Sequence, residues 1–104
     1  MDSPRDVYDE IADELLAQDP DVELGLMMGM PCVKARGKLI AGIWDDEMVF
    51  KLPDPAVRKQ ALALDGARLF APGGRAFKEW VQVPAGHMGE WPGLADEALR
   101  LRSG

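Results

Sequence analysis

The sequence predicts an α+β fold with two layers, in the order helix, three strands, helix, two strands, helix. Apolar residues recur at helical spacing near both ends of the chain. Residues 22–52 are instead rich in Val, Ile and Met and are interrupted by glycine, which favours strands. The turns between these strands are short, which favours antiparallel neighbours. We therefore expect one mainly antiparallel five-stranded sheet with all helices on one face.

The first helix has clear signals at both of its ends. Ser3 suits the N-cap and Pro4 the first helical position. The apolar stripe of the helix contains Val7, Ile11 and Leu15. Asp19–Pro20 is expected to end the helix, because the residue before a proline avoids the helical conformation.

The central region is predicted to form a meander. Its three expected strands cover about 22–35, 38–44 and 47–52. The first strand is expected to bend near Gly29, and the connecting turns are placed at Arg36–Gly37 and Asp45–Asp46.

The remaining elements follow from proline and glycine positions. A second helix is expected to begin with Asp54 as N-cap and to end at Asp65–Gly66. Two further strands are expected over about 68–71 and 79–83, and a last helix over about 90–101. The whole of 1–104 is interpreted as a single domain.

The composition argues against an enzyme. The 104 residues include no Thr and no Asn, and the two serines are Ser3 and Ser103, near the ends. Nucleophilic catalysis by an interior Ser or Thr is therefore excluded. No catalytic residue and no cofactor-binding residue is predicted.

The one cysteine and the one histidine also give little support for a catalytic or metal-binding site. Cys32 lies on an expected strand, where a buried structural thiol is the usual outcome, and a reactive Cys32–His87 pair is the alternative. One Cys and one His cannot complete a zinc site without several carboxylates, so no metal is expected. The acidic run 45–47 is interpreted as a turn, with a weak divalent-ion site as the alternative.

The net charge of −6 is concentrated at the N-terminal end, since residues 1–24 hold nine acids and one base. Such a region is typical of a solvated helix face, or of a surface that repels nucleic acid or attracts a basic partner. Two basic clusters lie elsewhere, and their members are Lys34, Arg36 and Lys38 in the first and Arg75 and Lys78 in the second. They support an alternative function, nucleic-acid binding, although the net negative charge and the acidic first helix oppose a phosphate backbone. The other interpretation is that they are charged hairpin tips, which keep a sheet edge soluble.

A second surface is predicted from the large apolar side chains. A sheet covered by helices on one side leaves its other face open, and side chains on that face are candidates for an interaction surface. The candidates are Trp44, Trp80, Met28 and Met30. The sequence thus favours a non-enzymatic module that binds a protein partner or self-associates, with a homodimer as the simplest case.

The element order and several motifs resemble the TfoX N-terminal domain family. The similarity covers roughly 5–102 and rests on the glycine bend at 28–30, the turn and strand at 37–41, the strand at 48–52 and the block 78–84. The resemblance implies a short, single-domain member without the second domain of the competence regulators, so a role in transcription or competence regulation does not transfer directly. The same motifs are more distantly similar to YjbR-like proteins, described as DNA-binding modules. Neither resemblance implies a catalytic residue.

The sequence also predicts where the chain acts. It shows no secretory leader and no apolar run long enough to cross a bilayer, and a single cysteine gives no sign of an oxidising compartment. A cytoplasmic location and no membrane partner are expected.

Overall fold

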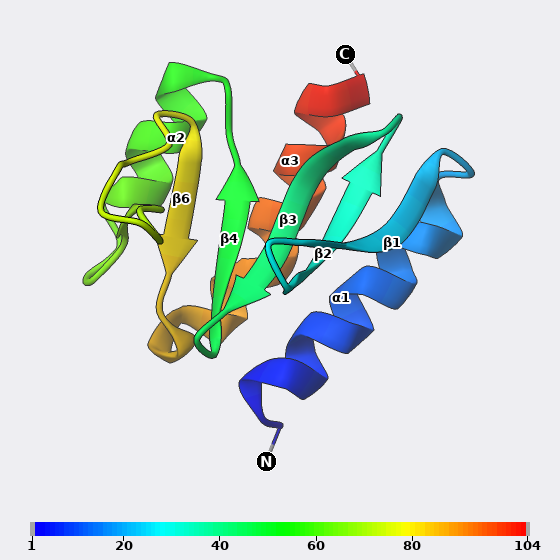
Figure 1. The fold of residues 1–104 in the computed structure, drawn as a ribbon, viewed down its shortest axis with the longest axis horizontal. Helices are drawn as coiled ribbons and strands as arrows, with labels where there is room; N and C mark the ends of the chain where they lie inside the picture. Colours follow the sequence, from blue (N-terminus) through cyan, green and yellow to red (C-terminus); the bar gives the residue numbers. More distant parts are fainter. Residues whose placement is uncertain (1, 104) are drawn as a thin grey trace.

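A computed structural model describes residues 2–103 and confirms the α+β class (Figure 1). Over these residues the chain forms three α-helices, one short 3-10 helix and a six-stranded antiparallel sheet in the order β1-β2-β3-β4-β6-β5. The helices are α1 (Pro4–Gln18), α2 (Pro55–Leu62) and α3 (Trp91–Ser103), and the 3-10 helix is η1 (Ala85–Glu90). The strands are β1 (Val22–Met27), β2 (Met30–Ala35), β3 (Lys38–Trp44), β4 (Glu47–Lys51), β5 (Arg68–Leu69) and β6 (Trp80–Val83).

Both predicted helix caps are present. The hydroxyl of Ser3 accepts a hydrogen bond from the Asp6 amide at 3.2 Å, and the Asp6 carboxylate accepts one from the Ser3 amide at 3.3 Å. This reciprocal pair is a capping box, and it satisfies amides that the first helical turn cannot. Asp54 caps α2 in the simpler way, with its carboxylate 2.8 Å from the Ala56 amide.

The strand predicted over 22–35 is two strands rather than one bent strand, so the sheet has six strands instead of five. Met28 and Gly29 have φ values of 52° and 79°, which makes them a two-residue turn of the kind that joins tight hairpins. Turns with positive φ at both positions also join β2 to β3 and β3 to β4. The result is a meander of three consecutive hairpins.

All three helices pack on one face of the sheet, as predicted, and the main core lies between the two layers (Figure 1). Its largest buried side chains include Trp91 from α3, Phe50 from β4 and Leu15 from α1. An irregularity in the β2–β3 pairing pairs Val33 with Ala41 but Lys34 with Leu39, so β3 has one extra residue here. Ile40 and Ala41 both join the helix-side core because of this bulge.

Among residues 2–103, every helix is too short or too polar to span a bilayer.

Candidate functional site

The face of the sheet that carries no helix is partly covered by the chain itself. Between β5 and β6 the segment 70–79 folds back, and the Phe70 amide donates to the Trp80 carbonyl at 2.8 Å. The Phe70 side chain is completely buried against this face. Sequence reasoning interpreted most of this segment as a plain loop and missed Phe70.

Phe70 and three other aromatic rings form a cluster. The Trp44 ring meets Phe70 edge-on with centroids 5.7 Å apart, and the Trp80 ring stacks on Phe70 at 5.9 Å. Phe77 stacks on Trp80 at 4.8 Å and remains 40% exposed. Such ring pairs stabilise a structure beyond their buried area. The two tryptophans predicted to form an interaction surface therefore contact the chain's own aromatic residues.

The two methionines predicted for the same surface lie apart. Met30 is buried on the open face beside Cys32 and Leu39, and its methyl group lies over Gly42. Met28 is on the β1–β2 turn and is 61% exposed. The structure thus brings Trp44, Trp80 and Met30 into one cluster and leaves Met28 at the edge of the sheet.

Strand β1 forms one edge of the sheet and carries exposed leucines. The Arg36 amide donates to the Asp21 carbonyl at 3.1 Å. In an antiparallel pair every second residue forms hydrogen bonds with the partner strand, so this bond shows which residues of β1 bond to β2 and which do not. The backbone groups of Val22, Leu24 and Leu26 consequently point away from β2. The Val22 amide donates to the Asp19 carbonyl at 3.1 Å, and among residues 2–103 no strand pairs with the outer side of Leu24 and Leu26. The side chains of Leu24 and Leu26 are 53% and 69% exposed.

A groove separates these leucines from α1. Its volume is about 460 Å³, and its α1 wall includes Tyr8, the Arg5–Asp9 ion pair at 3.0 Å and the Asp13 carboxylate. Burial raises the pKa of the Tyr8 hydroxyl, so this wall of the groove is acidic through Asp13 and not through Tyr8. The edge of the sheet is therefore apolar on the strand and anionic on the helix.

The predicted basic residues do not converge on one surface. Lys34 extends over Gly25 on the open face, with its Cε 3.3 Å from the place a Cβ would occupy. Arg36 forms an ion pair with Asp21 at 3.3 Å. Lys38 turns to the helix side of the sheet, while Arg75 and Lys78 are exposed in the segment 70–79.

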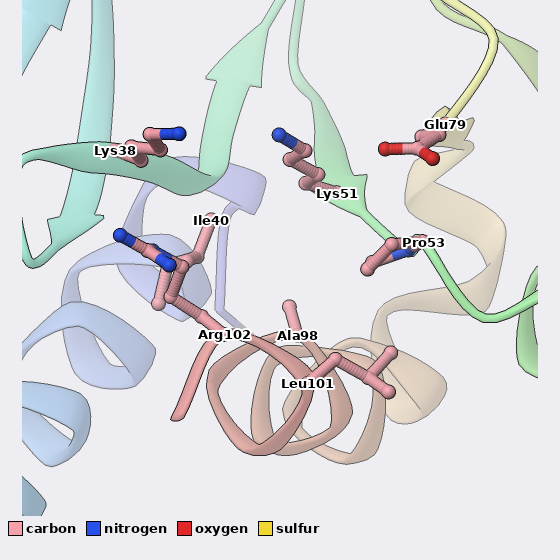
Figure 2. A pocket seen from close by; sticks show the side chains of 8 residues that line it. All are labelled: Lys38, Ile40, Lys51, Pro53, Glu79, Ala98, Leu101 and Arg102. Carbon is pink, nitrogen blue, oxygen red and sulfur yellow. The ribbon is translucent and has the colours of Figure 1, made fainter. Parts of the chain in front are cut away.

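Lys38 instead lines a small cavity at the end of the sheet (Figure 2). The cavity has a volume of about 190 Å³, and Lys51 from the end of β4 and Arg102 from the end of α3 also line it. Arg102 is held in place because its Nε donates to the Ala35 carbonyl at 3.2 Å and its Nη2 to the Arg36 carbonyl at 3.4 Å. Sequence reasoning missed Lys51 and Arg102. The β3–β4 hairpin register would have placed Lys51 near Lys38, but nothing local indicates Arg102.

Cys32 and His87 are not brought together. Cys32 is buried in the open-face cluster, as predicted, and burial raises the pKa of its thiol. The Nε2 of His87 instead lies 2.9 Å from the Asp65 carbonyl.

The acidic run 45–47 forms a turn, as predicted. Asp45 and Asp46 are its central residues, and the Glu47 carboxylate accepts hydrogen bonds from Arg68 at 2.7 Å and Gln82 at 2.8 Å. Within residues 2–103, no three side chains of the His, Cys, Asp or Glu type are grouped closely enough to hold a metal ion.

Cys32 is expected to react with a thiol-specific reagent at least about 100 times more slowly in the folded protein than in urea. It is 1% exposed and its raised pKa keeps it in the unreactive thiol form at neutral pH. Labelling with a chromogenic disulfide, with and without denaturant, measures the ratio. Fast labelling of the folded protein would show that the open-face cluster opens readily.

Comparison with protein-family models, with curated proteins and with solved structures found no match for this chain.

Proposed function

We propose that this chain is a small non-enzymatic interaction module, and that a second copy of the chain adds to its edge strand β1. The observation that carries the proposal is the pair of exposed leucines on a strand that has no further strand on its outer side among residues 2–103. An unprotected edge of this kind is a template for pairing with another strand. A regulatory role in the cytoplasm, like that suggested by the TfoX resemblance, is compatible with such a module.

Strand β1 is complementary to itself. A two-fold antiparallel pairing centred on Leu24 uses the outward backbone groups of Leu24 and Leu26 and the carbonyl of Val22, whose amide already donates to Asp19, and places Leu26 opposite Val22 of the second copy. The same register places Glu23 opposite Gly25 of the second copy, and Lys34 lies over that glycine. In each half of the pairing, Leu26 therefore meets Val22 on the helix side of the sheet, and Glu23 lies near Lys34 of the other copy on the open face.

The acidic helix α1 opposes this association. Two-fold pairing of β1 puts the helices of both copies on the same side of the joined sheet. Beside the groove each α1 carries the Arg5–Asp9 ion pair, which is neutral overall, and the Asp13 carboxylate. The exposed Asp13 carboxylates of the two copies repel one another, and added salt screens exposed charges. We therefore expect the dimer to become tighter as the salt concentration rises.

The test is sedimentation velocity over a range of protein and salt concentrations. The wild-type chain is expected to show a monomer–dimer equilibrium, and Leu26→Lys is expected to weaken dimerisation at least about tenfold by placing a charge in the apolar pairing. Ala63→Lys is the matched control, because it adds the same charge at an exposed position on the far side of the fold.

Two results would contradict the proposal. One is a strict monomer at millimolar concentration and high salt. The other is equal weakening by Leu26→Lys and Ala63→Lys, which would assign the effect to net charge and not to the strand edge.

Nucleic-acid binding stays an alternative prediction with less support. Lys34 and Lys38 point to opposite faces of the sheet, and Arg36 is paired with Asp21. A phosphate backbone needs several cations along one surface. The predicted clusters do not form such a surface.

A further inference from the structure

We infer that the cavity at the end of the sheet binds the phosphate group of a small phosphate monoester. In Figure 2 the ammonium groups of Lys38 and Lys51 point toward each other, and the guanidinium of Arg102 lies on the same side of the cavity as Lys38. None of the residues that line this cavity belongs to β1, so the inference goes beyond the proposed strand pairing and does not depend on it.

The net positive charge around the cavity favours an anionic ligand. Three cations and the single carboxylate of Glu79 line it, which leaves a net charge of +2. Neither Lys38 nor Lys51 forms an ion pair with any carboxylate of residues 2–103. A phosphate monoester carries a charge of about −1.5 to −2 at neutral pH and balances this excess, whereas a carboxylate balances only half of it.

The donors that remain around the cavity also suit a phosphate group. The Nε and Nη2 of Arg102 already donate to the carbonyls of Ala35 and Arg36. The Nε/Nη2 edge of the guanidinium is thus occupied, whereas its Nη1/Nη2 edge keeps three free N–H hydrogens. This edge lies beside two lysine ammonium groups, which act as point charges, and donors on three side chains suit the three terminal oxygens of a phosphate group.

The rest of the cavity indicates the kind of molecule that carries the phosphate. Its inner wall is apolar and includes Ile40, Ala98 and Leu101. The carboxylate of Glu79 lies across the cavity from Arg102 and can accept a hydrogen bond from a hydroxyl or amine of the ligand (Figure 2). The volume of about 190 Å³ is below that of typical drug-sized sites and fits a molecule of a few carbon atoms.

The experiment is an NMR titration of the full chain with n-propyl phosphate, inorganic phosphate and butyrate, at neutral pH and low salt. Saturable amide shifts are expected around Lys38, Lys51 and Arg102. Propyl phosphate is expected to bind most tightly, because it combines the dianion with an apolar part, and butyrate most weakly.

Variants separate the cavity from the general charge of the surface. The double variant Lys38→Gln, Lys51→Gln is expected to bind propyl phosphate at least about tenfold more weakly, since it removes two charged donors. Lys59→Gln is the matched control, because Lys59 is exposed on α2 and does not line the cavity, and its affinity should stay within about twofold. Leu101→Ala is expected to remove the preference for propyl phosphate over inorganic phosphate.

Three results would overturn the inference. They are the absence of saturable binding of propyl phosphate to the wild-type chain, an equal loss of affinity in Lys59→Gln, and tighter binding of butyrate than of propyl phosphate. A single-stranded oligonucleotide that displaces propyl phosphate from the same residues at lower concentration would assign the cavity to nucleic acid and also overturn it.

Discussion

Phe70→Ala is expected to lower the free energy of unfolding by about 3–5 kcal/mol, the usual range for removing a buried aromatic ring. Phe70 is 0% exposed and contacts the rings of Trp44, Phe77 and Trp80. Its loss leaves a cavity and detaches the segment 70–79 from the sheet. Urea denaturation measures the loss, which is a large part of the 5–15 kcal/mol typical of a natural protein.

Phe77→Ala is the matched control for this change. Phe77 stacks in the same cluster but is 40% exposed, so its truncation is expected to lower the stability by only about 1 kcal/mol. Tryptophan fluorescence adds a second measurement, since Trp44 and Trp80 should become more exposed to water in Phe70→Ala. Similar losses for both variants would mean that Phe70 does not anchor the segment.

Gly42→Val is expected to lower the free energy of unfolding by about 3 kcal/mol, at the upper end of the range for overpacking. Gly42 lies in β3 under the side chain of Met30, and a Cβ there would be 2.9 Å from the Met30 methyl carbon. It would also be 3.0 Å from the Pro31 carbonyl oxygen, which belongs to the backbone and cannot move aside easily. Thermal or urea unfolding provides the measurement.

A double variant separates these two contacts. Adding Met30→Ala to Gly42→Val removes the flexible neighbour, so the pair is expected to be less destabilised than the sum of the single changes. Gly73→Val is the control, because a Cβ at Gly73 meets nothing within 4 Å. A neutral Gly42→Val, or strict additivity with Met30→Ala, would contradict the close packing of the open face.

The sequence was informative where the physical signal is local. Ser3 and Asp54 cap helices because their oxygens reach amides two or three residues away, and both were predicted. The hairpin at Met28–Gly29 was missed, since Pro31 nearby suggested a bend rather than a strand. Pro31 lies near the start of β2 and pairs with Leu26 of β1. The pairing of β2 with β3 begins only at Cys32, so the amide hydrogen that proline lacks is not needed there.

The candidate sites depended on contacts that no local pattern contains. Lys38 was identified as part of a basic cluster, but its partners in space are Lys51 and Arg102, which three different elements bring together. Trp44 and Trp80 were correctly placed among the large apolar side chains, yet Phe70 decides how far they are exposed. Which residues of separate strands and helices lie close together depends on the order of the strands in the sheet. The sequence predicted five strands and did not give their full order.

The three consecutive hairpins also bear on how the chain folds. Every strand pairing within residues 22–51 joins neighbours along the chain, so each closes a short loop. Only the pairing of β4 with β6, in which Lys51 meets Trp80, closes a long one. Among the strand pairings of residues 2–103, the largest entropic cost of loop closure therefore falls on the addition of β6 to the meander.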